Sequence, residues 1–210
     1  MSPTDSASDL KLSPGTIAVH GGERTDEQEF GAVVSPVFHS ATFAFKDFDE
    51  MRRYAHGELP DAYFYSRYAN PTVAEAERKI AELEGAEACV VTSSGSAATF
   101  CTMATLCLSG DEVIACDSVY GGTVKILTKV LARFGIRSRF ITVDEIADLS
   151  ELAGETSRVF WFESPANPLN RIVDLSLAAE VSKTAGLFQL LTTLSLLPFC
   201  SNQSLTELTL

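Results

Sequence analysis

The chain has 210 residues, 46% of them hydrophobic, which is enough to bury the core of one large domain. Its 16 basic and 28 acidic residues give a net charge of −12, which excludes the basic face that nucleic acids and anionic membranes require. Five cysteines without metal-type spacing, and no apolar run of the ~18 residues that span a membrane, favour a cytoplasmic protein with free thiols.

The first part of the chain predicts little regular structure. Residues 1–11 are polar and lack the apolar core of an export signal, so we expect a disordered leader. Residues 12–70 are assigned to an N-terminal arm, and their Gly- and Pro-rich first part, up to Asp47, is expected to be extended. Asp47 is a typical capping residue and predicts a short helix that reaches Tyr54.

An aromatic cluster at residues 63–68 precedes a second helix. Asn70 followed by Pro71 predicts the helix start, and Gly85 predicts its end. Arg67 lies among the tyrosines of the cluster. It is either part of a surface patch that packs on itself or an anion clamp, because Arg and Tyr both donate hydrogen bonds to phosphate oxygens. The predicted buried face of the helix consists of Val73, Ala76, Ile80 and Leu83.

Residues 91–98 form a turn rich in serine between two predicted elements. The apolar, β-branched run at 86–92 predicts a buried strand. The residues that follow predict a helix with one buried face, made of Ala97, Cys101, Ala104 and Leu108. A strand that turns into a helix through small residues leaves backbone N–H groups free at the positive end of the helix dipole, which is typical of a phosphate site. This stretch alone is equally compatible with an ordinary turn in which Ser94 is the N-cap.

Strands and helices are predicted to alternate from residue 86 onward. Strands are expected at 112–116, 136–143 and 158–162, and helices at 122–134, 144–152 and 174–185. This alternation predicts an α/β fold with a parallel sheet covered on both faces, in which ligands bind at the carboxyl ends of the strands. Three groups of residues follow predicted strands: Ser94 to Ser96, Tyr120 to Gly122, and residues 163–168. We therefore expect a shared pocket at that edge.

Four motifs, in order, resemble the pyridoxal-phosphate enzymes of cysteine and methionine metabolism: Tyr65-Ser66-Arg67-Tyr68-Ala69-Asn70-Pro71-Thr72, Ser93-Ser94-Gly95-Ser96-Ala97-Ala98, Val119-Tyr120-Gly121-Gly122-Thr123 and Glu163-Ser164-Pro165-Ala166-Asn167-Pro168. That family includes cystathionine γ-synthase, cystathionine γ-lyase, homoserine-ester sulfhydrylases and methionine γ-lyase. The resemblance implies a fold-type I, aspartate aminotransferase-like fold, with residues 71–186 as an incomplete large domain. The first and third motifs argue against an aminotransferase of the same fold.

The resemblance also implies roles in binding pyridoxal 5'-phosphate. Gly95 and Ser96 would hold the phosphate through backbone N–H groups. Ser96 stands where the family commonly has methionine, a change that leaves the backbone donor in place. Tyr120 would be the catalytic side chain, stacking on the pyridine ring and assisting proton transfer; the alternative is a core aromatic beside a helix start. Asn167 would bind the phenolic oxygen of the cofactor. No metal is implied.

The same resemblance implies partners. Tyr65 and Arg67 would reach the cofactor phosphate of a neighbouring subunit, so the enzyme would be a homo-oligomer, and intact members are expected to be homotetramers. Substrates would be small amino acids of the cystathionine, homoserine-ester, methionine or cysteine class, in reactions that form or cleave C–S bonds. Neither nucleic acid nor membrane is an expected partner.

Two chemical groups of the family are missing from the 210 residues. One is the aspartate, in an Asp-Asn-Thr-Phe-Ala-Thr-Pro motif, that pairs with the pyridinium nitrogen. The other is the lysine that forms the Schiff base with the cofactor. None of the six lysines falls in a matching motif: Lys11, Lys46, Lys79, Lys125, Lys129 and Lys183. We therefore expect little or no turnover from these residues alone.

The composition changes after Gly186. Residues 187–210 contain no Lys, Arg or Asp and a single acidic residue, Glu207. The family motif and its usual continuation read Asp-Asn-Thr-Phe-Ala-Thr-Pro-Ile-Leu-Gln-Gln-Pro. A DNA sequence that encodes this segment can, when it is translated from one base further on, encode the residues found from Thr192 to Gln203. This agreement predicts a frame-shifted tail, with the shift near residues 186–188. The apolar run at 187–191 is still expected to take the place of a sheet strand.

Two functional hypotheses remain open. The chain is either part of a γ-elimination or γ-replacement enzyme, or a non-catalytic fragment or pseudoenzyme. The latter would bind phosphate or cofactor weakly or associate with intact subunits.

Overall fold

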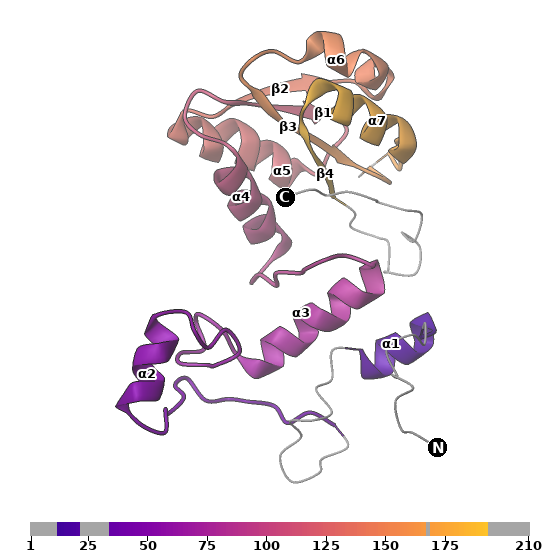
Figure 1. Cartoon of the computed structure of the whole chain (residues 1–210). Helices are drawn as coiled ribbons and strands as arrows, with labels where there is room; N and C mark the ends of the chain where they lie inside the picture. Colours follow the sequence, from indigo (N-terminus) through magenta and orange to yellow (C-terminus); the bar gives the residue numbers. More distant parts are fainter. Residues whose placement is uncertain (1–11, 22–33, 167–168, 193–210) are drawn as a thin grey trace. The chain divides into compact units, whose positions relative to one another are not determined.

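The computed structural model describes residues 12–21, 34–166 and 169–192, which fall into two units (Figure 1). The N-terminal unit is Met1–Val91 and the C-terminal unit is Thr92–Leu210. The sequence placed a boundary at residues 70 and 71 instead. The helix that follows residue 70 clusters with the N-terminal unit, and the extent of a partial large domain stays a prediction.

The N-terminal unit contains three helices among its described residues: α1 (Pro14–His20), α2 (Phe48–Ala55) and α3 (Pro71–Glu84). Helix α1 corrects the expectation that this part of the arm is extended. The Ser13 hydroxyl accepts a hydrogen bond from the Thr16 backbone N–H at 3.2 Å, and Pro14 occupies the first turn, where its missing N–H costs nothing. Because α1 packs against α3, tertiary contact stabilises a helix too short to persist alone.

Helix α3 begins and ends where the sequence predicted, and α2 begins after the predicted cap Asp47 and ends one residue beyond the predicted Tyr54. Asp47 caps α2 by accepting from the Glu50 N–H at 2.8 Å, and Gly85 ends α3 with a φ of 65°. The predicted buried face of α3 was wrong, since Val73 is 42% and Ile80 is 40% exposed. The buried residue of α3 is Ala81, because this helix packs within its unit against α1 and leaves the side of Val73 and Ile80 exposed.

The C-terminal unit is built on a parallel sheet, as predicted. Its described strands are β1 (Glu112–Cys116), β2 (Arg137–Ile141), β3 (Ser157–Glu163) and β4 (Phe188–Thr192), in the order β2-β1-β3-β4. Strand β4, which pairs Leu190 with Trp161 of β3, confirms that the apolar run after Gly186 takes a strand position. The centres of β1 and β3 are buried, as expected for parallel strands with both faces covered.

Helical segments cover this sheet on two sides (Figure 1). On one side lie α4 (Gly95–Leu106) and α5 (Gly121–Lys125), the latter continuing through η3 (Ile126–Val130) and η4 (Leu131–Phe134). On the other lie η5 (Val143–Asp148), α6 (Leu149–Leu152) and α7 (Leu175–Ala185). These confirm the predicted helices. In the parts of the chain that the structure describes, no helix is long and apolar enough to cross a membrane.

Two sequence-based expectations around α4 were wrong. Its buried residues are Thr99 and Met103, whereas Cys101 is exposed, because α4 turns the Thr99 side toward β3 and α5. Residues 86–92 form no strand, and Val90 is 80% exposed. A strand needs a neighbour to satisfy its backbone groups, and none of the described strands pairs with this run.

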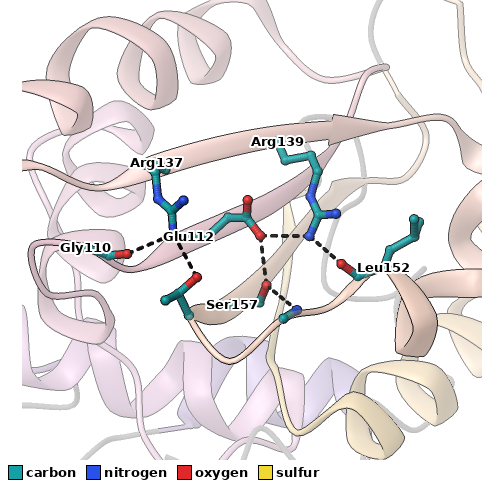
Figure 2. A network of polar contacts seen from close by, with 8 residues as sticks. Gly110, Glu112, Arg137, Arg139, Leu152 and Ser157 are labelled. Atoms are coloured by element: carbon teal, nitrogen blue, oxygen red, sulfur yellow. Dashed lines mark hydrogen bonds and ion pairs between the residues drawn. The ribbon is translucent and has the colours of Figure 1, made fainter.

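A polar network joins the amino ends of three strands (Figure 2). Glu112 of β1 accepts hydrogen bonds from the Arg139 guanidinium at 2.8 Å and from the Ser157 hydroxyl at 2.9 Å. Arg137 of β2 donates to the Thr156 hydroxyl at 2.8 Å. Because the Glu112 side chain is only 16% exposed, its charge is compensated mainly by these partners.

We expect Glu112→Ala to lower the free energy of unfolding of the C-terminal unit by about 2 kcal/mol, because Arg139 and Ser157 lose their shared acceptor. The matched control is Glu155→Ala, an exposed acid in the loop before β3. That variant should change the free energy by less than about 0.5 kcal/mol. Urea titration of both variants measures the difference, and equal midpoints would contradict a structural role for the network.

Candidate functional site

Helix α4 begins with exposed backbone donors. Ser94 is the N-cap, with extended dihedral angles, and its hydroxyl accepts from the Ala97 N–H at 3.2 Å. The N–H groups of Gly95 and Ser96 lie in the first turn, where helix geometry provides no acceptor. Both residues are exposed, and a Cβ placed on Gly95 would meet nothing within 4 Å. The two readings of this turn are therefore compatible: Ser94 caps the helix and leaves Gly95 and Ser96 open toward an anion.

The start of α4 lies near the carboxyl edge of the sheet. Helix α4 packs against β3 and α5, and only the short segment 107–111 separates its end from the amino end of β1. A helix that ends at the amino edge and lies along the sheet must begin toward the opposite edge. The predicted phosphate donors and the carboxyl ends of β1 and β3 thus belong to one side of the unit.

Tyr120 follows β1 at this edge and is held at both backbone groups. Its N–H donates to the Glu163 carboxylate at 2.6 Å, and its carbonyl accepts from the Val124 N–H at 3.1 Å. The residue is 46% exposed, which does not fit a core aromatic. A Cβ on Gly122 would lie 2.2 Å from Tyr120 Cε1, so the ring rests directly against Gly122.

Glu163 is the site residue that sequence reasoning missed. It is the last residue of β3 and only 1% exposed. It is the first residue of the fourth motif, for which the resemblance implied no role. The sequence does contain a signal for Glu163, because it is a single carboxyl group directly after the apolar run Val159 to Phe162. A polar group buried at the end of such a run requires a hydrogen-bonding partner.

Cys116 ends β1 at the same edge but is chemically inert. Burial, with a smaller effect from the Asp117 carboxylate, raises the pKa of its thiol to about 12. The thiol therefore stays protonated at neutral pH and is not a nucleophile.

The segment after β3 folds back on itself. The Ser164 hydroxyl accepts from the Val173 N–H at 3.1 Å, and the Ala166 N–H donates to the Arg171 carbonyl at 2.9 Å. Ala166 is 1% exposed. Asn167, the predicted ligand of the phenolic oxygen, lies outside the described residues.

Tyr65 and Arg67 belong to the N-terminal unit, where they lie side by side. The Arg67 guanidinium carbon is 5.6 Å from the centroid of the Tyr65 ring, a cation–π distance. Tyr65 forms an antiparallel bridge with Thr42, and the Asn70 amide, which caps α3, donates to the Phe38 carbonyl at 3.1 Å. The arm thus fixes the backbone of this motif while Arg67 stays exposed.

Comparison with known proteins identifies relatives over most of the chain. The model of the family described as Cys/Met metabolism PLP-dependent enzyme matches residues 15–201. An O-succinylhomoserine sulfhydrylase from Pseudomonas aeruginosa is 38% identical over 173 residues, covering 81% of this chain and 42% of the relative. A cystathionine γ-lyase from Bacillus subtilis is 37% identical over 171 residues, with the same coverage of both chains.

Solved structures agree with these relatives. A Campylobacter jejuni protein assigned as an O-acetylhomoserine (thiol)-lyase, which carries N'-pyridoxyl-lysine-5'-monophosphate, superposes with a TM-score of 0.81 at 28% identity. The superposition covers 90% of this chain and 46% of that one. The predicted fold class, a partial fold-type I domain with a parallel sheet, is confirmed. The chain spans about two fifths of the curated relatives it matches.

Proposed function

Because the chain belongs to the family of Cys/Met metabolism PLP-dependent enzymes, we propose that it is part of an enzyme that forms or cleaves C–S bonds in sulfur amino acids. Its 210 residues would supply the phosphate side and one ring face of the pyridoxal 5'-phosphate site. The observation that supports this most directly is the open N-terminus of α4 on the same side of the unit as the exposed Tyr120 ring.

The residues present fit the phosphate end of this cofactor. A phosphate dianion is stabilised by backbone N–H groups at the positive end of a helix, and α4 offers Gly95 and Ser96 in open space. When bound, pyridoxal phosphate delocalises negative charge that develops on the substrate carbon beside its amino group. The contribution of this chain is to bind and orient the cofactor.

Tyr120 would contribute a ring face and a phenol near the reacting atoms. Its exposed ring can stack on a pyridine ring, and its hydroxyl can accept or donate a proton. Asn167 would hydrogen-bond the phenolic oxygen of the cofactor. Tyr65 and Arg67 would donate to the phosphate held by a neighbouring subunit, which requires a homo-oligomer.

Substrates of the proposed enzyme are small amino acids of the cystathionine, homoserine-ester, methionine or cysteine class. The named relatives, a sulfhydrylase and a cystathionine γ-lyase, differ in reaction although each matches 81% of this chain. We propose a cytoplasmic location, consistent with the free thiols among the described cysteines.

Gly95→Pro tests the phosphate site. Proline removes one N–H donor but suits the first turn of a helix, and Ser94 already has the extended backbone required before proline. We expect affinity for pyridoxine 5'-phosphate, which has no aldehyde, to fall about tenfold or more, because one hydrogen bond to a charged group is lost.

Ser96→Ala is the matched control, since it keeps the backbone N–H groups of the turn and adds no atom to the space proposed for the phosphate. Calorimetry or ligand fluorescence on the 210-residue chain measures both affinities, with inorganic phosphate as competitor. Absence of phosphate-dependent binding in the parent chain would refute the proposed cofactor site.

The second candidate function is a non-catalytic fragment or pseudoenzyme. It is favoured by the six lysines, none of which lies in a family motif. For these 210 residues we expect no lysine to take up pyridoxal phosphate stoichiometrically. Borohydride reduction followed by peptide mass spectrometry measures such attachment. Labelling of a single lysine that disappears in urea would refute this alternative.

We also propose that residues 187–210 are read out of frame. In that reading Thr192 stands where the family has its pyridinium-pairing aspartate, and the structure pairs Thr192 with Glu163 at the end of β3. Strand β4 places Gln189 Nε2 and Thr192 Oγ1 in buried positions with no hydrogen-bond partner among the described residues. Such orphaned groups cost about 1–3 kcal/mol each, although Arg139 Nε of β2 and Trp161 Nε1 of β3 are orphaned in the same way. The family match itself extends to residue 201.

Sequencing the gene and its transcript across codons 180–210 decides this. We expect a neighbouring reading frame to encode Asp-Asn-Thr-Phe-Ala and its continuation. A coding region without that motif in either alternative frame would exclude the frame shift.

A further inference from the structure

The backbone at Tyr120 is held by Glu163, a motif residue to which the sequence assigned no role. Glu163 reaches from the end of β3 to the segment after β1, where it accepts the Tyr120 N–H at 2.6 Å. Because Glu163 is 1% exposed, water competes little for this bond. The turn that carries Tyr120 is therefore tied to the adjacent strand.

The ring of Tyr120 occupies space that a different residue, Gly122, leaves free. A Cβ on Gly122 would lie 2.2 Å from Cε1, 2.9 Å from Cδ1 and 3.0 Å from Cζ of Tyr120. Any larger residue at this position must displace the ring. The preceding glycine is unlike it, since a Cβ on Gly121 meets nothing within 4 Å. The two glycines of the motif thus have separable effects on the same ring.

The geometry points to Glu163 and Gly122 as a pair of positioning residues for Tyr120: Glu163 holds its backbone, and Gly122, which lacks a Cβ, leaves free the space that its ring occupies. This rests on the proposed function, in which Tyr120 stacks on the pyridine ring of the cofactor. The pair acts through Tyr120 and touches neither cofactor nor substrate in this role. Its expected effect is on recognition of the ring, and the phosphate donors at the start of α4 should be unaffected.

The first test compares Gly122→Ala with Gly121→Ala in the full 210-residue chain. The chain has five tyrosines, so 3-fluorotyrosine labelling with Tyr120→Phe for assignment gives a cofactor-independent signal from this ring. We expect Gly122→Ala to shift the Tyr120 fluorine resonance and Gly121→Ala to leave it in place. Equal spectra of the two variants would overturn the role of Gly122.

The second measurement is the ratio of affinities for pyridoxine 5'-phosphate and inorganic phosphate. Gly122→Ala should lower this ratio about tenfold, the scale of one lost aromatic stacking contact, and Gly121→Ala should leave it within about twofold. A purely structural defect would weaken both ligands together and keep the ratio. Failure of the parent chain to bind pyridoxine 5'-phosphate would refute the proposed function, whereas the fluorine spectra still decide the positioning.

Glu163 is tested by a conservative pair. Glu163→Ala removes the acceptor and should shift the Tyr120 resonance and lower the affinity ratio. Glu163→Gln keeps an acceptor oxygen at the same reach and should restore both toward the parent values. If Glu163→Ala unfolds the chain, Glu163→Asp is used in its place. This variant shortens the side chain by one methylene and should also shift the Tyr120 fluorine resonance. A parent-like Tyr120 signal in the shortened or truncated variant would overturn the role of Glu163.

Discussion

The parallel direction of the four strands is the constraint on which the C-terminal unit depends. Parallel neighbours must be joined by crossovers, so helices cover both faces and bury the centres of β1 and β3. Polar groups gather at the two ends of the described sheet. The amino end is filled by the network of Glu112, Arg139 and Ser157. The carboxyl end keeps exposed donors and an exposed ring, which is why function is assigned there.

The sequence predicted best where local signals and tertiary contacts agree. Strand 112–116 was located residue for residue because it is a short apolar run with both faces buried. Helix α3 was bounded correctly because Asn70 and Gly85 are caps that act through their own backbone. Tyr120 and the turn at Gly95 were singled out because a serine- or glycine-rich segment after a strand is a local pattern.

The wrong or missing predictions share a cause, because each concerned a feature that depends on contacts with residues distant in the sequence. The run 86–92 has strand composition but no neighbouring strand among those described. Helix α1 was missed because its seven residues gain their stability from packing on α3. The buried face of α4 was misassigned because nearly every position in this helix is apolar or small, so periodicity could not choose a side. Glu163 was given no role because its partner lies 43 residues away.

The position of β4 in the described sheet determines which strand pairs the proposed change of reading frame would alter. In the described sheet β4 is an outer strand, hydrogen-bonded to β3 alone, while β3 keeps β1 on its other side. A change in the protein sequence that begins at Gly186 therefore reaches the margin of the sheet and leaves the β1–β3 pair intact. The same event placed earlier in the gene, before β3, would remove a central strand and with it the core. The order of the strands in space, which differs from their order in the sequence, thus sets how many of the described strand pairs such a change would spare.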